Sequence, residues 1–312
     1  MDADGRGLQL KNLRSSACIR VLINSRCTVK IILSRKGFDA SAGGVASPLL
    51  PDGTLLSLPI PDVNGPVTYG ELTWGQHAVG DLVTALTRGR LAHHTHVHLD
   101  PDLYGPICPR RPGWRPLFGQ DGAAQSHLQN QGVGVGDLFL FFGWFRAVEA
   151  QGGSYRFVKS APDQHLIYGW LQVGTILTNA QLTTATPPWA VTQPHCGGGR
   201  GSRNTVYIAS PTLTLAGRTT AIPGAGYLGD YRETYRLTAP NRLRTQWRLP
   251  RWFYPTAGRP PLSYHTALTR WACTDDYAYL HSATRGQEFV LDTVYYPEAL
   301  SWIVDLLPQT SD

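Results

Sequence analysis

Charged residues are scarce in this chain of 312 residues, where they make up 16% of the sequence against about 25% in an average soluble domain. Apolar residues make up 42%, which is enough to bury a hydrophobic core, so a largely disordered protein is excluded. The 33 glycines and 23 prolines follow no three-residue period, which excludes collagen. What remains is a globular protein with many turns.

Other features are also missing. The five cysteines are scattered and form no Cys-x-x-Cys pair, so neither a disulfide framework nor a thiolate zinc site is indicated, and a reducing cytoplasm fits best. No apolar run approaches about 18 residues, so we expect no membrane span and no membrane partner. Only four of the 28 basic residues are lysines, and the net charge of +6 is too weak to indicate nucleic acid by itself.

Hydrophobic periodicity predicts an α+β protein rich in strands. We expect strands at 29–33, 93–99, 137–145, 165–177, 204–209 and 289–294. Helical spacing of apolar residues predicts a few short helices, at 79–91, 122–131 and 297–307. The predicted fold is therefore a mixed sheet with few short helices.

The densest set of metal-binding side chains lies at 93–102. On a strand, alternate side chains share a face, so His94, His96, His98 and Asp100 would project together. Imidazoles with carboxylates are ligands for zinc or non-haem iron, so one interpretation is a divalent metal with His98 and Asp100 among its ligands. The alternative is a solvated polar face, because the spacing matches no named metal motif.

A polar loop, Ser34 to Asp39, directly follows the first hydrophobic strand. We expect Ser34, Arg35 and Lys36 to hold a phosphate and Asp39 to act as an acid or base, because ligand groups tend to lie at strand ends. The glycine pattern is not that of a P-loop. An ordinary charged turn is the alternative.

Amides and small residues gather at 115–127. Gln120, Gln125 and His127 would read a base edge, because an amide presents a donor and an acceptor together, and Arg115 would bind the same substrate. The alternative is a helix start in which small residues allow close packing. We interpret His195, with the glycine-rich run after it, as a flexible loop.

An aromatic strand begins at Gly136-Asp137, and a Gly-x-x-x-Val strand follows at 169–173. Together they resemble the small base-binding barrels of the PUA, ASCH and EVE type. Trp144 and neighbouring aromatic side chains would then sandwich a base. The alternative is that these aromatics fill a core.

Six blocks in register, from residue 29 to near the C-terminus, resemble the third of the nucleotide modification associated domain families of phages and bacteria. The blocks are 30–39, 55–62, 68–72, 98–102, 118–127 and 136–145. The resemblance implies a role in DNA or nucleotide base modification, with a nucleotide or DNA and other enzymes of the modification system as partners. It does not supply the reaction.

The same resemblance suggests how the chain is organised. Members of the family begin at the first strand, so we interpret 1–28 as an N-terminal extension from an upstream start, with Val29 as the native start. We expect 29–312 to form a single composite domain, because the blocks run through both halves. In it, 29–131 would carry the site loops and 132–312 would form a barrel-like half ending in the C-terminal helix.

Three functions are consistent with these residues. The first is an enzyme, or enzyme component, acting on a nucleobase or nucleotide. Asp39, Asp100 and Asp102 would serve as acid/base groups or metal ligands, together with His127. The second is a non-catalytic reader that holds a modified base flipped from DNA. The third is a structural partner in a modification system. A catalyst needs its carboxylates and His127 in one pocket, whereas a reader needs an aromatic cage.

Overall fold

The computed structural model describes residues 28–182, 184–198, 200–284 and 286–308. The predicted N-terminal extension, 1–28, lies outside the described residues except for its last position. Within the described ranges, no helix is both long enough and apolar enough to cross a membrane.

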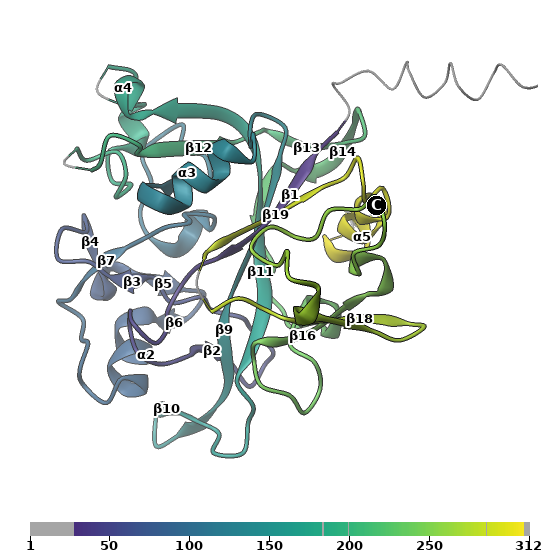
Figure 1. The fold of residues 1–312 in the computed structure, drawn as a ribbon. Helices are drawn as coiled ribbons and strands as arrows, with labels where there is room; N and C mark the ends of the chain where they lie inside the picture. Colours follow the sequence, from purple (N-terminus) through teal and green to yellow (C-terminus); the bar gives the residue numbers. More distant parts are fainter. Residues whose placement is uncertain (1–27, 183, 199, 285, 309–312) are drawn as a thin grey trace, which may run out of the picture.

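A nine-stranded mixed sheet occupies the centre of the molecule (Figure 1). Its main path runs β19-β1-β9-β11-β12-β8, with β1 parallel to β9 and every other pair along the path antiparallel. These strands are β1 (Lys30–Arg35), β8 (Leu117–Gln120), β9 (Leu138–Gln151), β11 (Gln164–Thr178), β12 (Thr205–Ala209) and β19 (Glu288–Asp292). Beside this path, β2 (Ser47–Leu49) and β10 (Ser154–Phe157) pair with β9, and β15 (Ala225–Tyr227) pairs with β11.

β9 lies inside the sheet because its first half is apolar on both faces, from Leu138 to Phe142. A strand paired in parallel with a neighbour usually has both faces covered, as here. Asp137 fixes where the strand begins, since one of its carboxylate oxygens accepts the backbone N–H of Lys30 at 2.7 Å and the other that of Gly134 at 2.8 Å. The strand-rich α+β fold with a mixed sheet is confirmed.

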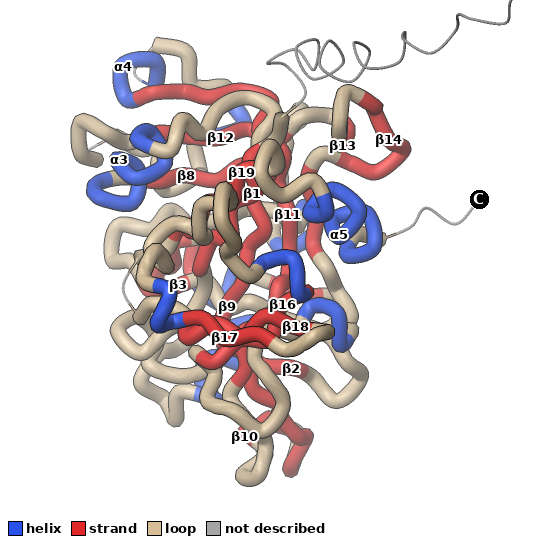
Figure 2. Tube along the Cα trace, turned by 45° about the vertical axis from the view of Figure 1, so that its right-hand side comes forward, coloured by secondary structure: helices blue, strands red, loops and turns tan. Residues whose placement is uncertain are grey.

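Smaller elements surround this sheet, and Figure 2 shows that the helices among them are short. The small sheets contain β3 (Ile60–Pro61), β4 (Val67–Thr68) and β7 (His96–His98); β5 (Thr73–Trp74) and β6 (His77–Ala78); β13 (Thr212–Leu215) and β14 (Arg218–Pro223); and β16 (Gln246–Pro250), β17 (Trp271–Cys273) and β18 (Tyr277–His281). The α-helices are α2 (Val79–Leu86), α3 (Gly122–Asn130), α4 (Asn179–Leu182) and α5 (Glu298–Leu306). In Figure 1, α2 with the β3-β7-β4 sheet lies on one side of β9 and β11, and α5 with the β16-β18-β17 sheet lies on the other.

The helix predicted at 79–91 is shorter than expected, and the reason is local. The hydroxyl of Thr87 donates to the carbonyl of Val83 at 2.7 Å and accepts the N–H of Leu91 at 3.1 Å. Arg88 and Gly89 then have φ of 56° and 77°, in the left-handed region that ends a helix. The helices predicted at 122–131 and 297–307 correspond to α3 and α5.

The two ends of the main path face each other across what we call the seam. No backbone pairing among the described residues joins β19 to β8, so the predicted barrel portion is not confirmed. Side chains connect them instead. Gln120 Nε2 on β8 donates to Oε1 of Glu288 on β19 at 2.6 Å, and Lys36 Nζ lies 4.6 Å from the centre of the Phe118 ring. The curled sheet therefore closes through polar side chains, and the candidate site lies beside them.

Candidate metal centre

His98 and Asp100 meet at the end of β7, but the predicted row of four ligands does not form. β7 is only three residues long, so its alternation stops before it could align the whole row. His94 is exposed, and His96 Nδ1 bonds to the carbonyl of Gly65 at 2.8 Å. Only His98 and Asp100 of that row share a site.

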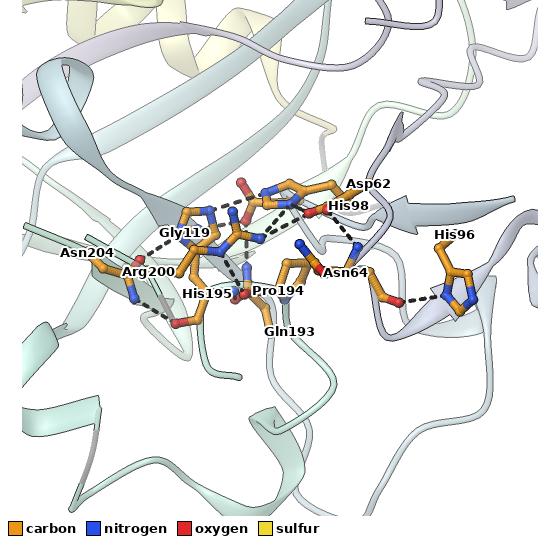
Figure 3. A network of polar contacts seen from close by, with 12 residues as sticks. Asp62, Asn64, His96, His98, Gly119, Gln193, Pro194, His195, Arg200 and Asn204 are labelled. Carbon is orange, nitrogen blue, oxygen red and sulfur yellow. Dashed lines mark hydrogen bonds and ion pairs between the residues drawn. The ribbon is translucent and has the colours of Figure 1, made fainter. Parts of the chain in front are cut away.

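The third member of the site is His195, from the loop that follows the 3-10 helix Pro188–Ala190. Its Nε2 lies 3.2 Å from Nε2 of His98, and Figure 3 shows the two rings meeting. One ligand atom from each of His98, Asp100 and His195 lies within 4.8 Å of the others. We call these three residues the triad. His195, which we expected in a flexible loop, is thus buried, with 5% of its surface exposed.

Gly119 on β8 makes room for this arrangement. A Cβ atom at this position would lie 2.2 Å from Cγ of His195, so any larger residue would displace the ring. The backbone N–H of Gly119 also donates to Oδ1 of Asp100 at 2.7 Å. One glycine therefore serves two members of the triad.

The tautomer of His98 follows from its neighbour Asp62. Nδ1 of His98 lies 3.0 Å from Oδ2 of Asp62, which also accepts a hydrogen bond from Arg200 at 3.0 Å (Figure 3). Burial opposes ionisation of Asp62, but these bonds, with the one from the N–H of Asn64, lower its pKa to about 2. Nη2 of Arg200 also lies 3.3 Å from Nδ1 of His98, farther than from Oδ2 of Asp62. An ionised carboxylate can only accept, so we assign the proton of His98 to Nδ1 and a lone pair to Nε2.

The tautomer of His195 is fixed in the same way by Asn204. The Asn204 amide donates from Nδ2 to the carbonyl of His195 at 2.7 Å, so its Oδ1 must accept from Nδ1 of His195 at 2.6 Å. Two Nε2 lone pairs therefore face each other, which is repulsive unless a cation lies between them. Burial lowers the pKa of both imidazoles, that of His195 to about 3, and disfavours a proton in that place. A metal ion between them would satisfy both nitrogens.

Asp100 presents one oxygen to the same point. Its Oδ1 accepts from Gly119 and, at 2.7 Å, from Nε2 of Gln193, whereas its Oδ2 has no hydrogen-bond partner among the described residues. Burial raises the pKa of Asp100 to about 7, although the positive charge of Lys36 opposes this. Two imidazoles and a carboxylate, each oriented from behind by a hydrogen bond, form a ligand set typical of zinc or non-haem iron.

A second polar group lies at the seam, next to the triad. Lys36 Nζ is 3.1 Å from Oε1 of Glu288. Burial has the largest effect on the pKa of each triad member; the charge of Lys36 adds to the lowering for the two imidazoles and opposes the raised pKa of Asp100. Glu288 is fully buried, and its Oε2 has no hydrogen-bond partner in the part of the chain that the structure describes. Ser34 pairs with Glu288 in the β1-β19 register, and its buried hydroxyl also has no hydrogen-bond partner among the described residues.

The other predicted acid/base residues lie in separate environments. Asp102 forms a two-pronged ion pair with Arg110, with one contact at 2.7 Å. Asp39 Oδ1 accepts from the backbone of its own turn, and His127 Nε2 lies 2.9 Å from the hydroxyl of Ser263. Within the described ranges, no hydrogen bond or ion pair connects Asp39, Asp100 and His127.

The predicted base-reading residues bond to the protein itself. Gln125 Oε1 accepts from the hydroxyl of Tyr207 at 2.9 Å, and Gln120 donates to Glu288. Arg115 donates to the carbonyl of Ala209. The remaining predicted residues, Arg35 and Trp144, line a cavity away from the triad.

Several residues of the site escaped the sequence analysis: Asp62, Gln193, His195, Arg200, Asn204 and Glu288. One of them carried a usable signal, because Glu288 directly precedes the apolar run Phe-Val-Leu of its strand, which ends at Asp292. The others lie in loops with no periodicity.

The sequence matches one protein family over most of its length. A family model described as nucleotide modification associated domain 3 matches residues 30–292. The chain belongs to this family. The match contains the whole triad and the seam, and it implies a role in nucleotide modification systems. Comparisons with curated proteins and with solved structures found no match.

Proposed function

We propose that this nucleotide modification associated domain is a metal-dependent enzyme that modifies a nucleobase, in DNA or as a nucleotide. The observation that carries the proposal is the pair of Nε2 lone pairs of His98 and His195, 3.2 Å apart, with an oxygen of Asp100 beside them. A divalent metal bound there supplies a Lewis acid and lowers the pKa of bound water.

The seam places two further groups next to the triad. The ammonium group of Lys36 attracts an anionic substrate, and the buried Oε2 of Glu288 is available to accept a proton. Of the predicted catalytic residues, the proposal keeps Asp100. Asp39 and Asp102 have structural roles in it, because their own turn and Arg110 already occupy their carboxylates.

The alternative of a non-catalytic reader has less support. A reader needs an accessible aromatic cage, but among the aromatic residues of β9 only Trp144 is partly exposed, and Phe139, Phe141 and Phe142 are fully buried in the core. The barrel on which a base-binding role would rest is not confirmed either. The titratable groups of the triad and the seam favour catalysis.

Mass spectrometry of nucleosides tests the proposal. DNA and nucleotide pools are compared between cells that express the wild type, Asp100→Asn, His195→Gln or an empty vector, with His96→Gln as the matched control. We expect an altered nucleoside in the wild type and in His96→Gln alone. The proposal fails if Asp100→Asn produces the same change as the wild type, or if the wild type matches the empty vector.

A further inference from the structure

A cavity of about 490 Å³ lies on the other face of β1 from the seam. Ser34 and Lys36 face the seam, and strand alternation directs Arg35 to the opposite side. There Arg35 lines the cavity together with Trp144 of β9, His165 of β11 and Arg244. The cavity is therefore distinct from the metal centre.

Two guanidinium groups border this cavity without a carboxylate partner. Arg35 donates to the carbonyls of Thr284 and Gly286, at 3.1 and 2.8 Å, and Arg244 lies 4.0 Å from the centre of the Trp144 ring. Among the described residues, neither arginine forms an ion pair. Burial lowers the pKa of Arg35; Asp39 opposes this, and the charge of Arg244 adds to it. An anion in the cavity would offset the repulsion between the two arginines.

Most other polar groups of the cavity are donors, although the carboxylate of Asp39 and the amide of Gln287 also line it. Nδ1 of His165 accepts from Nε1 of Trp247 at 3.0 Å, so the proton of this neutral imidazole lies on Nε2. Nε1 of Trp144 is buried and has no acceptor within the described ranges. Hydroxyls of Thr245 and Thr284 also line the cavity, and that of Ser41 donates to Oδ1 of Asp39, which accepts from its own turn as well. A site so rich in donors suits a ligand rich in acceptor oxygens, as a phosphate is.

We propose that this cavity binds a free nucleoside monophosphate, with the phosphate between Arg35 and Arg244 and the base against the Trp144–Arg244 pair. Arginine forks bind phosphate in two-pronged fashion, and both arginine and tryptophan offer flat surfaces on which a base stacks. The volume is within the range of small-molecule pockets, about 300–1,000 Å³, and is large enough for one nucleotide. This site goes beyond the metal-dependent function proposed above.

Calorimetric titration of the full chain tests the proposal, with thymidine 5′-monophosphate, thymidine, inorganic phosphate and a short single-stranded DNA as probes. We expect the monophosphate to bind more tightly than either thymidine or phosphate. Arg35→Gln and Arg244→Gln should each weaken binding about tenfold or more, because each removes a charged hydrogen-bond donor. Arg35→Lys keeps the charge and should retain part of the affinity.

Two further variants serve as controls. Arg218→Gln removes an exposed arginine of β14 and should bind like the wild type, and so should His195→Gln, which changes only the metal centre. The proposal is overturned if thymidine binds as well as its monophosphate, if only DNA binds, or if Arg218→Gln weakens binding as much as Arg244→Gln. None of these outcomes bears on the metal centre, whose readout is metal content.

Discussion

Each imidazole of the triad is held by one polar neighbour behind it. Asp62 orients His98, and Asn204 orients His195, so both Nε2 atoms point to the same place before any ion arrives. Such preorganisation reduces the cost of assembling a metal site, and losing a supporting residue commonly lowers metal affinity about 10–100-fold.

Removing either imidazole should therefore abolish metal binding. We expect the wild type to retain about one zinc or iron ion per chain after dialysis, and His98→Gln and His195→Gln to retain less than about a tenth of that. Inductively coupled plasma mass spectrometry measures both. His96→Gln should behave as the wild type, because His96 bonds only to the carbonyl of Gly65. Equal metal content in all four proteins would contradict the assignment.

Gly119→Ala should damage the site without changing any ligand. Its methyl group would lie 2.2 Å from Cγ of His195, so we expect the ring to move, metal to be lost and the free energy of unfolding to fall by about 1–3 kcal/mol. Gly134→Ala is the matched control, since no atom lies within 4 Å of the added methyl group. Urea unfolding measures the loss of stability, and a parallel metal assay measures the loss of metal. Unchanged metal content in Gly119→Ala would refute the role of Gly119 in making room for His195.

At the scale of elements, His265 joins a loop to the β16-β18-β17 sheet. Nδ1 of His265 donates to the carbonyl of Ser263 at 2.9 Å, and its Nε2 accepts the N–H of Ala283 at 2.9 Å, just after β18. The ring is fully buried, and burial lowers its pKa to about 4. Protonation would place a hydrogen where the N–H of Ala283 now donates.

The stability of the fold should therefore fall in mild acid. An unfolded histidine has a pKa of about 6.5, so between pH 6.5 and 4 the unfolded chain binds the proton that the folded chain rejects. Through His265 alone, the free energy of unfolding should fall by about 2 kcal/mol between pH 6.5 and pH 4.5. Urea unfolding at both values should show a smaller loss for His265→Gln, but an unchanged loss for His281→Gln, whose side chain is exposed. The same loss in all three proteins would disprove the link.

Elements with a strong apolar signal could be predicted from the sequence. β9 and β11 are long apolar runs, and α5 has helical spacing after a proline, so their existence follows from periodicity. β7 was predicted too long, because its ends depend on pairing with β3 and β4. Whether a sheet closes into a barrel depends on strand order and register, which periodicity does not specify.

At the scale of the whole molecule, one hydrophobic cluster contains residues from both predicted halves of the chain. Val29, Leu103 and Phe118 come from the first half, and Trp247 and Ile303 from the second. β1 also pairs with both β9 and β19, so the first strand is completed only by residues more than a hundred positions away. These contacts support the proposal that 29–312 folds as one composite unit.

A single unit should unfold in a single step. We expect the tryptophan fluorescence and the far-ultraviolet circular dichroism of the full chain to report the same urea midpoint. Two separated transitions, one for each predicted half, would contradict the proposal.

The candidate site was only partly predictable, because its residues lie far apart in the sequence. His98 and Asp100 lie two residues apart, so their residue types allowed a metal to be predicted there, although their spacing matches no named metal motif. His195 and Asn204 lie about a hundred residues away in an irregular loop, and Glu288 lies on the last strand. They reach the triad and the seam only because the sheet curls and the loop folds over Gly119.

Anomalous X-ray diffraction at the zinc and iron absorption edges shows whether the triad holds a metal ion. We expect one anomalous peak about 2.0–2.2 Å from Nε2 of both His98 and His195, with an oxygen of Asp100 as a third ligand. Crystals grown with these metals that show no peak there, or a peak bound only by other residues, would contradict this expectation.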